Sequence, residues 1–420
     1  MSIIPAVKIG NYRWRVVALL FFATTINYID RQILGMLKPF IENDFAMSEA
    51  GYGYIVSAFQ AAYAIGLLMS GRLIDKFGTR ISYALAVVVW SLAGCFHAAA
   101  RSAFGFGIAR FFLGIGESAN FPAAIKATAE WFPKKERALA TGIFNAGSNM
   151  GALIAPVIVS VITIKFGWRW AFIITGLFGF VWVLLWLLFY KLPTLSPKLG
   201  KSELDYITDG EQEDSNICGS SWKTLFKQRS TIGICAARFF SDWVWWFFLF
   251  WTPDFLNKMY NVDIKQMVLP LIIIYLLASV GGIVGGTISS TLIKRGFSLS
   301  FSRKAAMLIL AVCVMPIIII PGLSSLWLSV GLIGLAAFAH QGWASNVFTL
   351  VSDFYPKNSI GSMTGLAGFV GSVGGILAAI FIGQVLDLTG SYFLIFAVAS
   401  MAYLLAWTML QLTLPNNKYK

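Results

Sequence analysis

The stretch EWFPKKERALATGIFNAGSNMG, residues 130–151, returns later in the chain as DFYPKNSIGSMTGLAGFVGSVG, residues 353–374. The register between them is a shift of 223 residues, from 130 to 353, and it needs no gap. The same shift pairs Pro133 with Pro356, Thr141 with Thr364, Gly142 with Gly365, Gly151 with Gly374 and Gly167 with Gly390. An internal repeat in one continuous register indicates a chain built from two homologous halves.

The composition shows what kind of halves these are. Of the 420 residues, 58% are apolar and only 12% are charged, against roughly 25% charged residues in soluble domains. One membrane crossing takes roughly 20 mostly apolar residues, so the chain has room for about twelve crossings. A soluble globular enzyme is therefore excluded.

Clusters of charged residues, proline and glycine divide the sequence into twelve apolar spans. The predicted spans are 14–36, 52–74, 81–100, 103–126, 138–163 and 169–190, then 231–253, 266–292, 304–321, 326–351, 360–385 and 391–413. We predict an all-α membrane protein with two pseudo-symmetric halves of six transmembrane helices. Residues 1–190 form the first half, residues 191–229 a polar cytoplasmic linker and residues 230–420 the second half.

The basic residues predict how the chain is oriented in the bilayer. With both termini in the cytoplasm, 22 of the 32 Lys and Arg residues fall on the inner side and six on the outer side. This is the bias of the positive-inside rule. It accounts for the net charge of +13 without nucleic acid as a partner, and we expect a monomer in the cell inner membrane.

Ionisable residues inside apolar spans are the strongest functional signal, because each costs roughly 2.5–3.5 kcal/mol at the bilayer centre. Asn27, Asp30 and Arg31 lie within about one turn of the first span, and Arg110 and Glu117 lie two turns apart in the fourth. Opposite charges on neighbouring helices can satisfy one another, and a static ion pair is the alternative interpretation. A static ion pair needs one acid and one base, whereas these two spans contain two acids and two bases.

These charges suggest a coupling mechanism. We predict that Asp30 and Glu117, with Arg110, take part in proton coupling. An anion that binds Arg31 or Arg110 withdraws the cation from its acid and so favours protonation of that acid. Proton and anion then bind cooperatively.

In the second half, the repeat places His340 at the position of Glu117. His340 can donate to a hydroxylated ligand or titrate, and a structural histidine is the alternative. Arg238 and Asp242 lie four residues apart and are expected to form a pair within one helix. Tryptophans 243, 245, 246 and 251 crowd the seventh span, and we expect them in an interfacial aromatic belt, with a sugar-stacking wall as the alternative.

Polar residues between the repeated glycines offer contacts for a sugar-like ligand. Asn145, Ser148 and Asn149 lie in the fifth span, where structural hydrogen bonds between helices are the alternative. Gln341 and Asn346 complete the predicted substrate-binding set in the second half.

The loop GRLIDKFGTR, from Gly71 to Arg80, is predicted to change with conformation. Gly71 permits close helix approach and Gly78 is the second glycine of the pattern. Asp75, near a helix end, is expected to pair with Lys76 or Arg80. Ordinary interfacial charges are the alternative.

This loop resembles the inter-helix signature of the major facilitator superfamily, and the whole chain resembles its anion:cation symporter branch, including hexuronate transporters. The segments that carry the resemblance are NYIDR (27–31), SAFQAAY (57–63), ARFFLGIGES (109–118), EWFPKKERALATGIFNAGS (130–148), ELDYI (203–207), RFFSD (238–242), FAHQ (338–341) and SDFYP (352–356). The resemblance implies that Asp30 and Glu117 carry protons and that Arg31 and Tyr63 contact the substrate carboxylate.

The expected function is proton-coupled import of a sugar-acid anion, most simply a hexuronate such as glucuronate or galacturonate. An aldonate symporter is an alternative that the resemblance allows. Aldonate carriers of the family typically have an acid where this chain has Asp30, which favours an aldonate, but they have a glutamine where this chain has Ser148, which favours a hexuronate. Another organic-anion symporter, an exchanger and a non-transporting membrane sensor are the further alternatives. No catalytic motif and no Cys or His spacing for a metal is present, so we expect no enzyme activity, no cofactor and no metal.

Overall fold

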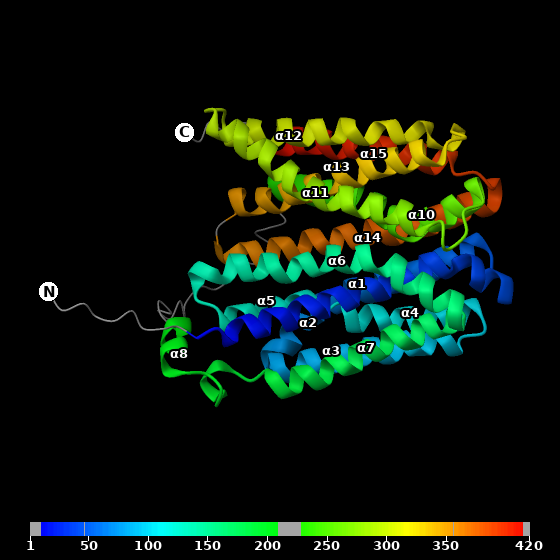
Figure 1. Ribbon diagram of the computed structural model, residues 1–420. Helices are drawn as coiled ribbons and strands as arrows, with labels where there is room; N and C mark the ends of the chain where they lie inside the picture. The colour runs from blue at the N-terminus through cyan, green and yellow to red at the C-terminus, as the bar shows by residue number, and fades with distance from the viewer. Residues whose placement is uncertain (1–9, 46, 209–227, 356, 415–420) are drawn as a thin grey trace.

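The structure is a computed structural model that describes residues 10–45, 47–208, 228–355 and 357–414. Long helices form two bundles that lie side by side (Figure 1). The first bundle contains α1 (Tyr12–Asp44), α2 (Glu49–Phe77), α3 (Thr79–Phe96), α4 (Ala103–Glu117), α5 (Asn120–Trp131), α6 (Lys134–Phe166) and α7 (Trp168–Phe189). The second contains α10 (Arg229–Tyr260), α11 (Val268–Lys294), α12 (Leu299–Val314), α13 (Leu326–Phe354), α14 (Lys357–Thr389) and α15 (Phe393–Thr413).

Among the described residues, ten helices are long and apolar enough to cross a membrane. The two predicted spans without such a helix are 14–36, within α1, and 103–126, divided between α4 and α5. Asn27–Arg31 lowers the hydropathy midway along α1, and α4 ends at Glu117 after only 15 residues. The count of twelve spans and the cytoplasmic position of the termini stay predictions.

Contacts within the bundles are more extensive than those between them. In the first bundle α1 packs on α6 and α7, and α2 on α4; in the second α10 packs on α14 and α15, and α11 on α13. The bundles meet where α2 contacts α14, α1 contacts α10 and α6 contacts α11. These six helices therefore surround the centre of the molecule (Figure 1). The boundaries at 190 and 230 stay predictions.

Two glycines paired by the 223-residue shift make equivalent helix contacts. A Cβ atom on Gly151 of α6 would lie 2.5 Å from the carbonyl oxygen of Thr25 in α1, and one on Gly374 of α14 would lie 2.6 Å from the carbonyl oxygen of Phe239 in α10. A larger residue at either position would force the helices apart. The repeat thus corresponds to the same packing in both bundles.

The helix pair α2 and α14 is closed at one end and open at the other. We call the end of the molecule where α1 begins and α15 ends the terminal end. At the opposite end, Cβ atoms on Gly53 and Gly383 would lie 2.5 and 2.6 Å from backbone oxygens of the partner helix. At the terminal end, Gly71 and Gly365 have no neighbouring atom within 4 Å of the added Cβ. The two helices therefore diverge toward the terminal end.

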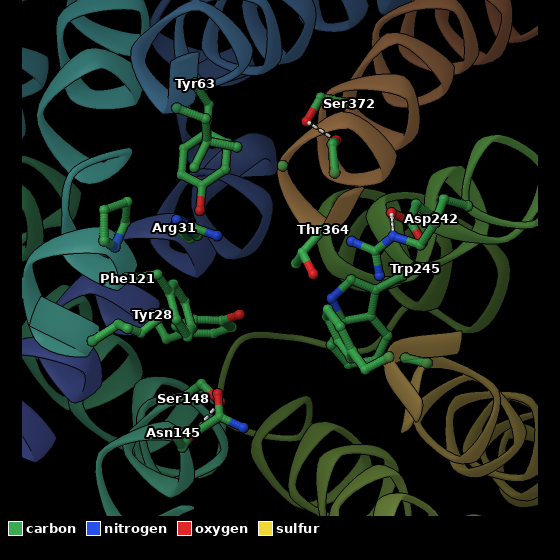
Figure 2. A pocket seen from close by; sticks show the side chains of 18 of the residues that line it. Tyr28, Arg31, Tyr63, Phe121, Asn145, Ser148, Asp242, Trp245, Thr364 and Ser372 are labelled. Carbon is green, nitrogen blue, oxygen red and sulfur yellow. Dashed lines mark hydrogen bonds and ion pairs between the residues drawn. The ribbon is translucent and has the colours of Figure 1, made fainter. Parts of the chain in front are cut away.

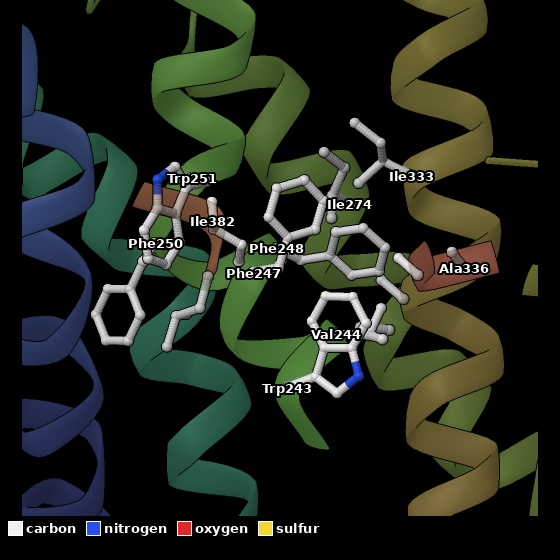
Figure 3. Close-up of a cluster of buried hydrophobic side chains, with 14 of the residues drawn as sticks. Trp243, Val244, Phe247, Phe248, Phe250, Trp251, Ile274, Ile333, Ala336 and Ile382 are labelled. Carbon is white, nitrogen blue, oxygen red and sulfur yellow. The ribbon is translucent and has the colours of Figure 1, made fainter. Parts of the chain in front are cut away.

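The aromatic run of α10 lies in the interior, not in an interfacial belt. Trp251 is fully buried and Trp243 is 7% exposed. Figure 3 shows Trp243 and Trp251 in a cluster with Phe247, Phe248 and apolar residues such as Ile274 and Ile333 of the second bundle. Trp245 and Trp246 face the cavity described below. The belt interpretation was wrong because α10 is surrounded by other helices.

The predicted linker contains a short helix, α8 (Lys201–Thr208), that is attached to the first bundle. The buried carboxylate of Glu203 accepts hydrogen bonds from the backbone N–H groups of Tyr12 and Arg13, at 3.2 and 3.1 Å. An acid at this place satisfies the first amides of α1 and complements the helix dipole. Residues 209–227 of the linker lie outside the described residues.

Candidate functional site

A cavity of about 1070 Å³ lies between the two bundles. It runs from the middle of the molecule toward the terminal end, where Gly71 and Asp75 of α2 and Thr364 of α14 line it. Figure 2 shows side chains of both bundles facing one another across this space. Its polar and aromatic lining includes Tyr28, Arg31, Tyr63, Asn145, Ser148, Asn149, Arg238, Asp242, Trp245, Trp246, Tyr275, His340, Gln341 and Ser372.

Most of the predicted substrate-binding residues share this lining. Arg31, Tyr63, Asn145, Ser148, Asn149, His340 and Gln341 are all among them. Asn346 is elsewhere: its amide is buried between α13 and α11 and donates to the carbonyl oxygens of Gly342 and Gly285, at 2.9 and 3.0 Å. The bond to Gly285 joins α13 to α11, and Asn346 is not part of the cavity lining.

Arg31 is held between one acid and several aromatic rings. Its Nε donates to Oε2 of Glu117 at 2.5 Å, an ion pair between α1 and α4. The guanidinium carbon lies 4.6 Å from the ring centroid of Tyr63, 5.0 Å from that of Tyr28 and 5.9 Å from that of Trp246. Its Nη2 has no hydrogen-bond partner among the described residues. Arg31 thus keeps a buried donor beside the cavity for an anionic oxygen.

Asp30 and Arg110 lie behind this pair and do not line the cavity. Both are buried, and neither forms an ion pair with a described residue within 4 Å. The guanidinium nitrogens of Arg110 also lack hydrogen-bond partners in the described part of the chain. The expected pairing of opposite charges is therefore realised in the described residues between Arg31 and Glu117 and does not extend to the second acid and base.

The second bundle presents a different wall. Nε of Arg238 lies 3.0 Å from Oδ2 of Asp242, which confirms the predicted pair within one helix (Figure 2). The ring of His340 stacks on Trp245, with centroids 5.0 Å apart and 6° between the planes. This wall therefore combines an already paired cation with stacked aromatic rings.

The polar residues of α6 are free to meet a ligand. The Ser148 hydroxyl donates to the backbone oxygen of Asn145 at 2.7 Å, within its own helix (Figure 2). No hydrogen bond among the described residues ties the side chains of Asn145 and Asn149 to another helix. The alternative interpretation, structural hydrogen bonds between helices, is not observed here.

The predicted conformational loop has a different ion pair from the expected one. Asp75 pairs with Lys126 of α5 at 2.6 Å, and not with Lys76 or Arg80. Gly78, with φ of +78°, turns the chain between α2 and α3. After this turn Arg80 faces α7 and donates to the carbonyl oxygen of Leu187 at 2.6 Å, so its guanidinium is directed away from Asp75.

An ion cluster at the opposite end joins the two bundles. The ammonium of Lys38 in α1, which is fully buried, lies 2.7 Å from Glu49 of α2 and 2.8 Å from Asp254 of α10. Lys258 of α10 also pairs with Glu49. The carboxylate of Asp387 in α14 accepts from the first amides of α2, at 2.7 and 3.0 Å. We call Lys38, Glu49, Asp254, Lys258 and Asp387 the opposite-end cluster.

Sequence reasoning missed this cluster, because Lys38 and Lys258 are two of the six basic residues that the charge distribution places in outer loops. The sequence did contain a signal: Lys38 and Asp254 lie at the ends of apolar spans, and each is followed four residues later by a residue of opposite charge, Glu42 and Lys258. In the described part of the chain no group of three or more His, Cys, Asp and Glu residues is placed to hold a metal ion.

Residues 20–379 match the family model of the Major Facilitator Superfamily. The chain belongs to the Major Facilitator Superfamily. Its membership confirms the resemblance seen in the sequence segments. In transporters built from two repeated halves, substrate sites generally lie at the interface between the halves.

This superfamily member is similar in sequence to known sugar-acid transporters and similar in fold to a solved transporter structure. It is 33% identical over 417 residues to the hexuronate transporter of Escherichia coli K12, covering 96% of this chain and 95% of that protein. It is 30% identical over 395 residues to the D-galactonate transporter of Escherichia coli O6:H1, covering 90% of each. A bacterial homologue of the human lysosomal transporter Spinster, in an inward-facing and unoccupied conformation, shares the fold, with a TM-score of 0.74, 19% identity and 96% coverage of each chain.

The chain is therefore a membrane transporter with several spans. Its family and the transporter names of its relatives agree with the expectation that it is not an enzyme.

Proposed function

We propose that the protein is a proton-coupled symporter that imports a sugar-acid anion across the cell inner membrane, with a hexuronate such as glucuronate or galacturonate as its substrate. The observation that carries the proposal is Arg31: a buried cation among aromatic rings, paired with Glu117 and lining the cavity. The hexuronate transporter of Escherichia coli K12, a relative over nearly the whole chain, supports the choice of substrate.

The substrate carboxylate binds at Arg31, next to Tyr63. An arginine suits this role because its planar group offers several donors to a carboxylate. The sugar hydroxyls then meet the amides of Asn145 and Asn149 on one wall, and His340 and Gln341 on the other. This division of contacts explains how both bundles sense one small ligand.

Proton coupling follows from competition for Arg31. A carboxylate that binds the guanidinium weakens its bond to Glu117, and the freed, buried Glu117 then gains a proton more readily. Asp30 and Arg110 form the second acid and base behind this pair. Entry of an anion into a negative-inside cell is opposed by about 2.3 kcal/mol per 100 mV, and each cotransported proton offsets one such charge.

In the proposed orientation, the conformation described here faces the cytoplasm. The cavity opens at the terminal end, which the distribution of Lys and Arg residues assigns to the cytoplasmic side. The loop from Gly71 to Arg80 lies at the same end. Transport then requires the two bundles to rock about the site, with the opposite-end cluster opening as the terminal end closes.

An aldonate is the second candidate substrate. The D-galactonate transporter of Escherichia coli O6:H1 is 30% identical to this chain, and Asp30 agrees with carriers of that type. A hexuronate and an aldonate both present one carboxylate and several hydroxyls, so the same site chemistry serves either one.

The function is tested by uptake into proteoliposomes that contain the purified protein. Labelled glucuronate, galacturonate and galactonate are offered in parallel with and without an inward proton gradient. We expect accumulation of a hexuronate that increases with the gradient and collapses when a protonophore is added. Accumulation that is unchanged by the protonophore would contradict proton coupling. Uptake of galactonate but of neither hexuronate would show that the substrate is an aldonate.

The variant Glu117→Gln separates binding from coupling. The amide can still accept a hydrogen bond from Arg31 but no longer takes up a proton, so we expect exchange of internal for external substrate to continue. Proton-driven accumulation should fall to the level of a simple equilibrium. The measurement is counterflow against gradient-driven uptake in the same vesicles, and wild-type accumulation by Glu117→Gln would exclude Glu117 from the proton path.

A further inference from the structure

A buried tyrosine outside the cavity contacts the histidine that lines it. Tyr403 of α15 is fully buried and does not line the cavity. Its hydroxyl oxygen lies 2.6 Å from Nδ1 of His340 in α13. The same hydroxyl donates to the backbone oxygen of Ser241 in α10, at 3.3 Å. Three helices of the second bundle are thus joined at one phenol.

The two hydrogen bonds together determine where the His340 proton lies. The oxygen of Ser241 can only accept, so the single proton of the Tyr403 hydroxyl is used in that bond. Nδ1 of His340, 2.6 Å from the phenol oxygen, is then placed to donate to it. A neutral imidazole carries one N–H, and hence Nε2 is left as a bare acceptor.

The contacts of the His340 ring indicate which of its nitrogens a ligand can reach. His340 lies flat on Trp245, and both residues line the cavity. Because Tyr403 covers the Nδ1 edge of the ring from the bundle interior, the edge that carries Nε2 is the one left for a ligand. The nearest charged groups on this wall, Arg238 and Asp242, already neutralise each other at 3.0 Å.

We propose that Tyr403 is a positioning residue that holds His340 with its proton on Nδ1, so that Nε2 recognises a hydroxyl of the substrate as a hydrogen-bond acceptor. The inference rests on the proposed function and adds a rule of specificity. With one carboxylate at Arg31, the far part of the ligand must offer an O–H to the second bundle. A second carboxylate there would place its lone pairs against that of Nε2, so dicarboxylic sugar acids are disfavoured against hexuronates and aldonates.

The direct test is ¹⁵N NMR of the full protein labelled at histidine. The chain has two histidines, and the second one is an internal reference: Nδ1 of His97 lies 2.7 Å from the carbonyl oxygen of Ala93, which can only accept. We expect both histidines to carry the proton on Nδ1. Wild-type His340 with its proton on Nε2 would overturn the proposal, and this measurement needs no variant.

The functional test is the substitution Tyr403→Phe. We expect His340 to lose its Nδ1–H signature while His97 keeps it. The affinity for the transported hexuronate should fall about tenfold, the usual effect of a lost polar contact, and the preference for glucuronate over the dicarboxylate glucarate should shrink. Tyr260→Phe is the matched control, because the Tyr260 hydroxyl bonds to Ser329 and to a backbone oxygen in the same bundle, away from the cavity.

Different results would contradict the proposed function and the proposed role of Tyr403. If the wild-type protein binds no sugar acid in calorimetry, the proposed function is wrong whatever the histidine signals show. If it binds glucuronate but Tyr403→Phe leaves the tautomer and the glucarate discrimination unchanged, only the role of Tyr403 is wrong. Loss of glucuronate binding in Tyr260→Phe as well would show that any missing phenol disturbs the bundle, which also contradicts a specific role for Tyr403.

Discussion

Replacing Arg31 with alanine lowers the affinity for the sugar acid by about a hundredfold or more. Removing one member of a buried, hydrogen-bonded charge contact costs about 2–5 kcal/mol, and Arg31 contacts both Glu117 and the proposed substrate carboxylate. Arg31→Lys keeps the charge but loses the planar fork, so we expect an intermediate loss. Isothermal titration with glucuronate measures the affinity of each variant.

The matched control for Arg31 is Lys126→Gln. Lys126 lines the same cavity but is partly exposed and is already paired with Asp75. An exposed ion pair contributes little, so the affinity should change by less than about threefold. Equal losses in Arg31→Ala and Lys126→Gln would mean that the cavity attracts anions by its overall charge and not at Arg31.

Replacing Lys38 with methionine should open the opposite end of the transporter. The substitution leaves the buried Asp254 without its closest cation and deprives Glu49 of one of its two. Asp254 keeps Lys258, at 3.2 Å, and the hydrogen bond from Tyr392, so its charge loses only part of its compensation. The full loss of a buried partner costs about 3–5 kcal/mol, and for this partial loss we expect the ratio of closed to open states to fall by about tenfold or more. Spin-label distances across that end of the two bundles, measured without substrate, report the shift.

Arg169→Gln is the control for this experiment. Arg169 also forms an ion pair at the opposite end, 2.8 Å from Asp44, but both residues belong to the first bundle. The distances between bundles should stay at their wild-type values in Arg169→Gln. The double variant Lys38→Met with Asp254→Leu removes both charges and should restore part of the closed population. Unchanged distances in Lys38→Met would show that apolar contacts alone close this end.

The sequence predicted the features that depend on pattern along the chain. Hydrophobic spans are local signals, and the shift of 223 residues is a repeat in the sequence. The structure places Gly151 and Gly374, which this shift pairs, in equivalent helix contacts. Opposite charges in the first and fourth spans were expected to satisfy one another because buried charges need partners, and the structure shows which two of them pair, Arg31 and Glu117. The break between α4 and α5 was not predicted, because residues 118 and 119 include neither proline nor glycine.

Features that depend on which face a helix presents could not be predicted. Asn346 is a polar residue in an apolar span, like Gln341, and the sequence alone does not tell that its amide faces α11. Lys38 and Asp254 come from different halves, and no local pattern links residues so far apart. Asp75 was assigned to a neighbour in the loop, whereas its partner Lys126 comes from another helix. Tertiary geometry decides all of these.

In the proposed transport cycle, the contact of the Asp387 carboxylate with the start of α2 can break at low cost. In the structure, it satisfies two helix amides that have no partner within their own helix. When the bundles separate at that end, water can take the place of the carboxylate at both amides. The contact therefore favours one position of α2 without adding a large barrier to leaving it. A carrier that returns to its starting conformation after each substrate requires such a contact.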